Sequence, residues 1–311
     1  MNQTATPAPP SPAFGTGEEY AIVAVTGEQA QDFLQRILTA DIPRPEASST
    51  ILAGLCSPKG RLLAIARLIP WHDGYRLILP REIVKPTLAR LQMYVLRSQV
   101  TITALHPHWQ LLQATGPGVA ERLAAHGLTL PAPERHACDR DERSVVRLPE
   151  APERYWILGP SEALHPLHEA LMQQLAKAPA PLWRQLEILA GQPQIVAATQ
   201  ELFLPQMVNL DRLGGVSFGK GCFPGQEVVA RTHYRGRVKQ RLGRACGPDA
   251  PPSPGTEIRD REDQLAGQVV IAAPTASGYT ALVSIRELQP DEPVTVAGEA
   301  LTLEAGATPT S

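Results

Sequence analysis

The pattern of apolar and polar residues predicts a strand followed by a helix near the start of the chain. Residues 20–25 are almost wholly apolar, as expected of a buried strand, and Thr26-Gly27 interrupts the run. Residues 28–38 then carry apolar side chains at the helical spacing i, i+3, i+4 and i+7, which places them on one buried stripe. These side chains are Ala30, Phe33, Leu34 and Ile37.

The same order returns later in the chain. Residues 109–114 form an apolar run, Thr115-Gly116 interrupts it, and a helical pattern covers 118–126. Because the pattern occurs only twice, it predicts two related halves of one α/β unit and not a solenoid. Further strands are expected at 75–79, 100–105 and 155–158, helices at 81–97 and 161–177, and an irregular connection over 130–152.

The character of the sequence changes after Arg244. Residues 247–255 contain four prolines and two glycines, and the apolar runs that follow are short and separated by turn residues. Short strands that alternate with turns are typical of a small antiparallel β-barrel or sandwich, which is expected here over roughly residues 241–308. Together with the strands and helices before it, this region predicts an α+β protein.

The composition limits the classes of function. With 311 residues the chain exceeds one average domain. Its formal net charge of -2 gives no global attraction to nucleic acid or to an anionic membrane, so any preference for anions must be local. No apolar run is long enough to cross a membrane. Residues 1–17 lack the basic start of a signal peptide and the arginines of a presequence, so a flexible tail is expected.

Four cysteines are scattered through the chain and form no C-x-x-C pair. This spacing does not favour a disulfide framework or a metal cage within one chain, so no metal site is expected. Free thiols suit a reducing compartment, and the cytoplasm is the expected location. A buried, inert thiol is the ordinary role of such residues. They are Cys56, Cys138, Cys222 and Cys246.

The glycine-rich segment 219–231 has the composition of a ligand-binding loop followed by a helix. Its three glycines and its proline allow a tight turn, after which Gln226 and Glu227 begin a short apolar helix. Cys222 lies just before this helix and two residues from Lys220. A helix N-terminus and an ammonium group both stabilise a thiolate, so Cys222 is predicted to be reactive. The alternative is a small packing residue in a structural turn.

Four cations alternate with other residues directly after this segment. In a strand, such alternation would place all four on one face, and no acidic residue occurs between Val228 and Pro248. The pattern is consistent with an anionic partner, such as a polyglutamate tail, a phosphate or an RNA backbone, and equally with a solvated strand face. The cations are Arg235, Arg237, Lys239 and Arg241.

A further segment, Cys56-Ser57-Pro58-Lys59-Gly60-Arg61, separates two apolar stretches and is typical of a turn. By itself it indicates no site. The sequence contains no dinucleotide-binding fingerprint, P-loop, H-E-x-x-H or G-x-S-x-G motif. The residues alone therefore predict a folded protein with a reactive thiol beside an anion-attracting face.

Taken together, these segments resemble the signature of the YgfZ family, folate-binding-fold proteins related to the aminomethyltransferase (T-protein, GcvT) of the glycine cleavage system. The resemblance runs from about Tyr20 to the C-terminal barrel, and its most specific element is Lys220-Gly221-Cys222. The other matching stretches are Thr39-Ala40-Asp41, Ser57 to Arg61, Tyr94 to Val100, Ala190-Gly191, Phe203-Leu204-Pro205-Gln206, Gly214 to Phe218, Phe223 to Glu227, Val229-Ala230-Arg231 and Arg235-Gly236.

The resemblance implies a GcvT/YgfZ-like arrangement of three domains, with two interleaved α/β domains over residues 18–240 and a β-barrel over 241–311. It implies a folate-dependent accessory role in assembling or repairing iron–sulfur proteins, including enzymes that thiolate tRNA, with tetrahydrofolate or a derivative as cofactor. The expected partners are iron–sulfur proteins or their assembly factors. The residues that the resemblance assigns are catalytic Cys222 and Lys220, folate-stacking Tyr20 and Trp183, and motif residues Gly221, Gly225, Gln226, Glu227 and Arg231.

The chain departs from the family pattern at several positions. Phe223 replaces the usual tyrosine, Tyr20 replaces a tryptophan, and Leu189 replaces a carboxylate often found before Ala190-Gly191. Two alternative functions follow from the residues. One is one-carbon transfer as in the T-protein, which uses an aspartate where this chain has only the apolar segment 62–65, and the other is an RNA-binding module that uses the cations.

Overall fold

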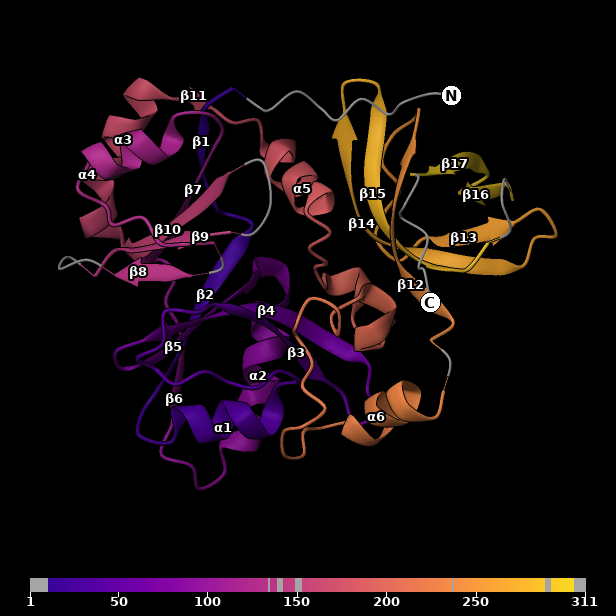
Figure 1. Cartoon of the computed structure of the whole chain (residues 1–311), viewed down its shortest axis with the longest axis horizontal. Coiled ribbons are helices and arrows are strands. Elements are labelled where there is room, and N and C mark those ends of the chain that lie inside the picture. Colours follow the sequence, from indigo (N-terminus) through magenta and orange to yellow (C-terminus); the bar gives the residue numbers. More distant parts are fainter. Residues whose placement is uncertain are drawn as a thin grey trace. The chain divides into compact units, whose positions relative to one another are not determined.

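The structure is a computed structural model that describes residues 11–133, 135–138, 142–148, 153–236, 238–288 and 292–304. The chain divides into two compact units (Figure 1). The first unit contains residues 1–34, 42–51 and 67–179, and the second contains residues 35–41, 52–66 and 180–311. Each unit therefore draws on separate parts of the sequence, and each is described by itself.

A six-stranded sheet in the first unit has the strand order β11-β1-β7-β10-β9-β8. One of its faces is covered by helices α3 (Val119–Ala125) and α4 (Ser161–Gln174), whose apolar residues share a core with the strands (Figure 1). The strands are β1 (Ala13–Thr16), β7 (Trp109–Thr115), β8 (His136–Cys138), β9 (Ser144–Arg147), β10 (Arg154–Pro160) and β11 (Ala176–Lys177).

A second sheet has five strands in the order β3-β4-β5-β2-β6. The chain passes from the second unit to the first within β4, since its residues up to 66 belong to the second unit. The strands are β2 (Tyr20–Thr26), β3 (Ile51–Cys56), β4 (Leu62–Trp71), β5 (Gly74–Pro80) and β6 (Thr101–Ala104). The helices that accompany this sheet are α1 (Ala30–Ile37), η1 (Arg81–Ile83) and α2 (Val84–Val95).

Within the first unit, the two sheets are joined by one apolar cluster. Tyr20 and Ile78 of the five-stranded sheet belong to this cluster together with Leu111 and Trp156 of the six-stranded sheet. The Tyr20 ring lies against the Trp156 ring, with 4.9 Å between their centroids and 55° between their planes. Burial of large apolar side chains from both sheets is what holds this layer together.

The predicted repeat of strand, glycine and helix is present. The strand β2 turns at Gly27 into α1, and β7 turns at Gly116 into α3, with φ angles of 113° and 100° at the two glycines. At Gly27 a Cβ atom would lie 2.4 Å from the Gln99 carbonyl oxygen, so the turn requires glycine. The sequence pattern therefore located both halves of the repeat correctly.

Three expectations from the sequence are wrong in part. Residues 13–16 of the expected tail form β1, which pairs with β7 and β11, while residues 1–10 lie outside the described residues. The region 130–152, expected to be irregular, contains β8 and β9. Its many charged residues obscured the apolar Val145 and Val146, which are buried. The expected helix 81–97 begins instead as the 3₁₀ turn η1.

The second unit contains a closed barrel with the strand order β12-β15-β14-β13-β16-β17, as the sequence predicted. The barrel strands are β12 (Gln240–Gly247), β13 (Glu257–Asp260), β14 (Leu265–Thr275), β15 (Gly278–Arg286), β16 (Val294–Val296) and β17 (Glu299–Leu303). Before the barrel, the chain forms α5 (Ala180–Leu189), the short helices η2 (Ala197–Thr199) and η3 (Pro205–Val208), and α6 (Gln226–Tyr234).

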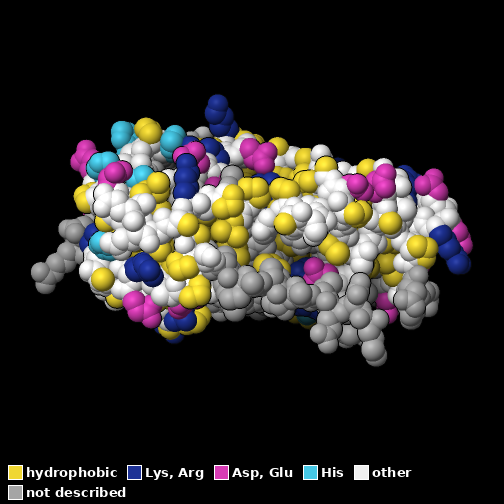
Figure 2. Space-filling view, turned by 90° about the horizontal axis from the view of Figure 1, so that it is seen from above, with side chains coloured by type: hydrophobic (Ala, Val, Ile, Leu, Met, Phe, Trp, Pro, Cys, Tyr) yellow, Lys and Arg dark blue, Asp and Glu magenta, His cyan; other side chains and the backbone are white. Residues whose placement is uncertain are grey.

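The surface carries charges of both signs. On the face drawn in Figure 2, cationic and anionic side chains lie interspersed in small groups and do not form a field of one sign. This agrees with the formal net charge of -2. In the described part of the chain, no helix has the length and apolar character needed to cross a membrane.

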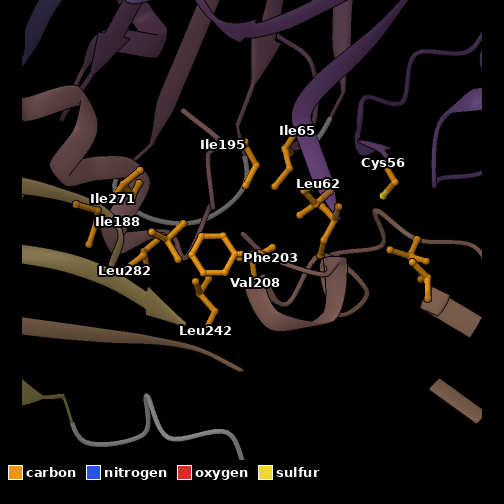
Figure 3. Packing of buried hydrophobic residues seen from close by; sticks show 14 of the residues in the cluster. Cys56, Leu62, Ile65, Ile188, Ile195, Phe203, Val208, Leu242, Ile271 and Leu282 are labelled. Atoms are coloured by element: carbon orange, nitrogen blue, oxygen red, sulfur yellow. The ribbon is translucent and has the colours of Figure 1, made fainter. Parts of the chain in front are cut away.

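One apolar core in the second unit connects the barrel with the segments that the sequence singled out (Figure 3). The Phe203 ring lies between Leu242 and Leu282 of the barrel strands and Leu62 of β4, and it is fully buried. Phe223 and Val229, from the glycine-rich loop and from α6, belong to the same cluster. The loop that carries Cys222 is therefore anchored at its C-terminal side in a packed core.

Candidate functional site

The turn at residues 57–61 and the glycine-rich loop, which are far apart in the sequence, meet in the second unit. Gly225 has a φ angle of 77°, and a Cβ atom there would lie 2.4 Å from the Ser57 carbonyl oxygen and 2.5 Å from the Gly60 backbone nitrogen. A real side chain cannot approach backbone so closely, so this contact requires glycine. The turn itself is closed by a hydrogen bond from the Gly60 N–H to the Ser57 carbonyl, at 2.9 Å.

Two glutamine side chains fix the start of α6. The Gln226 side chain accepts a hydrogen bond from the Phe223 N–H at 3.2 Å, while the buried Gln206 amide donates to the Val229 carbonyl at 2.7 Å. Phe223 and Val229 are themselves buried. The exposed Glu227 lies in the first turn, where its charge is favourable toward the helix dipole. The C-terminal end of the loop therefore has a defined position.

Lys220 is directed into the protein and binds backbone. Its ammonium group donates to the carbonyl oxygens of Leu38, at 2.7 Å, and Ala40, at 2.5 Å. Burial lowers the pKa of Lys220 from 10.5 to about 8, partly offset by the nearby Asp41. The motif lysine thus connects the loop to the segment that follows α1.

Thr39 makes a second set of bonds to the same region. Its hydroxyl donates to the Gly215 carbonyl at 2.5 Å and accepts from the Gly54 N–H at 2.8 Å, and its carbonyl accepts from the Ser217 N–H at 2.9 Å. Thr39 is fully buried. Through Thr39 and Lys220, the segment 38–41 holds residues 215–220 in place on the N-terminal side of Cys222.

Cys222 itself is exposed at the tip of this supported loop. Cys56 is fully buried, and burial raises the pKa of its thiol to about 12. Cys246 is half-buried, and burial together with Glu304 raises the pKa of that thiol. Among the cysteines whose side chains the structure describes, Cys222 is the one that is exposed, while Cys246 is half-buried. That Lys220 activates this thiol stays a prediction, since the ammonium group donates to two backbone carbonyls.

The two aromatic residues expected to flank a folate belong to different units. Tyr20 lines a cavity of about 440 Å³ in the first unit, together with Trp109 and the polar residues Arg81 and His106. This volume lies in the range of small-molecule sites. Trp183 is a buried residue of α5 in the second unit. Their shared role in folate binding stays a prediction.

The four cations expected on one strand face are not arranged in that way. Arg235 is the C-cap residue of α6, Lys239 precedes β12, and Arg237 lies outside the described residues. Arg241 is the one member within a strand, and its guanidinium forms an ion pair with Asp211 at 2.8 Å and donates to the Gln206 carbonyl at 3.0 Å. The expectation of a continuous basic strand is therefore wrong, because the helix ends later and β12 begins later than the alternation implied.

Two residues that hold the loop in place, and one buried carboxylate of α5, were not predicted as site residues. Thr39 and Gln206 occur in short segments of the family signature, but their hydrogen bonds to distant backbone could not be read from the sequence. Glu187 is a carboxylate that is 7% exposed, two residues before Leu189 in α5. Its signal was a single acidic residue within the otherwise apolar stretch 186–190.

Comparison with known proteins identifies the family of this chain. It is 30% identical over 296 residues to the tRNA-modifying protein YgfZ of Escherichia coli O157:H7 (strain EC4115 / EHEC), covering 93% of this chain and 90% of that relative. The chain belongs to the YgfZ family. The YgfZ of Hamiltonella defensa subsp. Acyrthosiphon pisum (strain 5AT) is 33% identical over 263 residues, covering 82% of this chain and 77% of that relative.

The YgfZ fold is also found among solved structures. The glycine cleavage system aminomethyltransferase T from Bartonella henselae superposes with a TM-score of 0.79 at 17% identity, covering 96% of this chain and 86% of that chain. At this identity the likeness concerns the fold alone. No family model matches the sequence. The family and the fold expected from the residues around Cys222 are thus both confirmed.

Proposed function

We propose that this YgfZ-family protein acts in tRNA modification as a folate-dependent accessory factor that assembles or repairs iron–sulfur proteins, through the Cys222 thiol. The name of its relatives, tRNA-modifying protein, supports the wider role. The observation that carries the finer proposal is the exposure of Cys222 on a loop whose two sides are fixed by buried contacts. The clients are iron–sulfur proteins or their assembly factors, in the cytoplasm.

The chemistry of the thiol suits this role. Thiolate sulfur is the ligand that iron–sulfur clusters use, and a thiolate is also the reactive form in exchange with a partner thiol. An exposed cysteine can reach a client protein, whereas Cys56 is buried. A loop that is held in one conformation loses less entropy when it engages a client than a mobile loop would. Lys220 and Thr39 serve here as positioning residues.

A reduced folate carries one-carbon units, and the residues available to hold it are consistent with a planar ring. Tyr20 and Trp109 provide aromatic faces to the cavity in the first unit, and Arg81 provides a cation at its wall. Trp183 offers a further ring in the second unit. Aromatic stacking is the interaction through which these side chains would bind a pterin.

Complementation tests the function. In cells that lack the endogenous YgfZ protein, expression of this chain is expected to restore both the activity of an iron–sulfur enzyme and the level of thiolated tRNA nucleosides, measured by mass spectrometry. An unrelated soluble protein expressed at the same level is the control. Restoration of neither quantity, with the chain present in soluble form, would contradict the proposal.

One-carbon transfer is the second candidate, because the fold resembles that of an aminomethyltransferase. The apolar segment 62–65 argues against it, since Leu62, Ala64 and Ile65 are buried and none carries an acid or base. The assay is formation of methylene-tetrahydrofolate from an aminomethyl-lipoyl donor. We expect no product above the uncatalysed rate, and turnover would favour this second candidate.

A further inference from the structure

The helix α6 that follows the Cys222 loop has one buried and one exposed face. Val229 is fully buried, while Val228 is 38% exposed and Tyr234 is 67% exposed. Arg231 and Arg235 are also exposed. Arg231 is three residues from both Val228 and Tyr234, which places it beside them on the helix surface, and Arg235 follows Arg231 by four residues at the C-cap. The exposed face therefore combines apolar and cationic groups.

Tyr234 is the outermost ring of an aromatic cluster. Its ring meets the His233 ring at 78°, with 4.7 Å between centroids, and the Phe218 ring at 71°, with 6.0 Å between centroids. Phe218 and His233 stack at 3.7 Å with 11° between their planes. This support limits the motion of Tyr234, so its exposed ring surface is held ready for a planar partner at little entropic cost.

The exposed cations on either side of Tyr234 in the sequence have no acidic partner in the part of the chain that the structure describes. There, Arg231, Arg235 and Lys239 are exposed and take part in no ion pair, in contrast to Arg241 and Arg244, which pair with Asp211 and Glu304. No Asp or Glu occurs over residues 228–248. Cations near a helix C-terminus also interact favourably with the helix dipole, which explains the two arginines. It does not explain an exposed tyrosine between them.

We infer that the exposed face of α6, with Lys239, binds a single-stranded segment of RNA. A nucleobase stacks on the Tyr234 ring, and Arg231, Arg235 and Lys239 bind the adjacent phosphates. A ring for the base and cations for the backbone is the combination that single-strand-binding surfaces use. An acidic protein segment would pair with the cations, but its carboxylates would not stack on the Tyr234 ring. The inference goes beyond the proposed function, because it assigns a direct contact with RNA and does not depend on the chemistry of Cys222.

The test is fluorescence anisotropy with a labelled mixed-sequence RNA about ten nucleotides long. The Tyr234→Ala variant is expected to bind about tenfold more weakly, from the loss of one stacked base. Tyr94→Ala, which removes a tyrosine of α2 in the other unit, is the matched control and is expected to bind as the wild type does.

Salt dependence tests the cations in the same assay. The variant Arg231→Gln/Arg235→Gln/Lys239→Gln is expected to lower the slope of log affinity against log salt by about 2, since each phosphate contact to a single strand contributes about 0.7. The control replaces exposed cations of the first unit, Lys85→Gln/Arg97→Gln/Lys177→Gln, and keeps the wild-type slope. Thermal unfolding by circular dichroism confirms that each variant is folded.

Unchanged RNA affinity in Tyr234→Ala, or an equal loss in the two triple variants, would overturn the inference. If polyglutamate competes with RNA at equal charge concentration and Tyr234→Ala binds RNA with unchanged affinity, the surface would be assigned to an acidic protein. The Cys222→Ala variant is expected to bind RNA as the wild type does. Failure of the RNA inference and failure of the cysteine proposal are thus separate results.

Discussion

The half-buried Lys220 holds the backbone on the N-terminal side of the Cys222 loop. Its position two residues before Cys222 suggested activation of the thiol, whereas the ammonium group donates to the carbonyls of Leu38 and Ala40. A buried ammonium that satisfies two carbonyls fixes the backbone on both sides of the contact. Lysine at this position therefore positions the loop, and the Cys222 thiol remains exposed.

The lowered pKa of Lys220 predicts a pH dependence of stability. Because the pKa is about 8 in the folded protein and 10.5 in the unfolded chain, the unfolded state binds more protons between these values. Stability contributed by Lys220 then rises with pH across this window. The unfolding free energy of the wild type relative to Lys220→Met, measured by denaturant titration, is expected to increase from pH 8 to pH 10.5. A difference that is constant or falls would contradict the assignment.

Gly225 gives a second prediction at the residue scale. An alanine there would have a Cβ atom 2.4 Å from the Ser57 carbonyl oxygen and a backbone at positive φ. Gly225→Ala is expected to lower the free energy of unfolding by about 3 kcal/mol, from strain and overpacking. Gly219→Ala is the control, because no atom lies within 4 Å of its added Cβ. It is expected to change the value by less than about 0.5 kcal/mol. Equal changes in unfolding free energy for Gly225→Ala and Gly219→Ala would show that the close approach of Gly225 to Ser57 is not maintained.

At the scale of elements, the regular segments were the predictable part. The spacing of apolar residues located β2, α1, β7 and α3 within a few residues, because one buried face imposes its period on the sequence. The basic segment was not predictable in this way. Among its described cations, Arg235 ends α6, Lys239 precedes β12 and Arg241 alone lies in a strand. Where no face is buried, alternation carries no information on the backbone.

The contacts that assemble the site were likewise not predictable from the sequence. The sequence named the loop at Cys222 and the turn at 57–61, but the contact of Gly225 with Ser57 depends on long-range packing. Thr39 and Gln206 act through hydrogen bonds to backbone that is distant in sequence. Such bonds follow from the tertiary structure, and no local pattern encodes them.

The segment that connects α1 to β3 yields a prediction of its own. Thr39→Val keeps the shape of the side chain but leaves the Gly54 N–H and the Gly215 carbonyl without their partner hydroxyl. The expected loss in unfolding free energy is about 2 kcal/mol, because buried polar groups then lack hydrogen bonds. Thr101→Val, at an exposed position of β6, is the matched control. A Thr39→Val variant as stable as this control would show that the hydroxyl bonds contribute nothing.

At the scale of the whole molecule, the sequence predicted an α+β protein with a C-terminal barrel, and the likeness to an aminomethyltransferase confirms that fold. The resemblance implied two interleaved α/β domains and a separate barrel, and the chain divides into two units that each combine separate stretches. The chain passes from one unit to the other within β4. A sequence pattern indicates which residues are buried, but it does not indicate which other segment they pack against. The proposed function likewise rests on one loop and not on the fold.

Folate binding is tested on the intact chain. Calorimetric titration with tetrahydrofolate is expected to give weaker binding for Trp183→Ala and for Tyr20→Ala, because each removes a ring proposed to stack on the pterin. Trp183→Phe and Tyr20→Phe keep a ring and are expected to retain most of the affinity. Tyr155→Ala, which removes a fully buried ring from the core beneath α3 and α4, controls for general destabilisation. Wild-type affinity in both alanine variants would exclude these two rings as the folate site.

The most direct test of the account is the comparison of two cysteine variants in cells that lack the endogenous protein. Cys222→Ser removes the exposed thiol. Cys246→Ser makes the same chemical replacement at a half-buried thiol of the barrel. We expect Cys246→Ser to restore iron–sulfur enzyme activity and thiolated tRNA nucleosides, and Cys222→Ser, present at the same soluble level, to restore neither. Full restoration by Cys222→Ser would contradict the proposal that the protein acts through the Cys222 thiol.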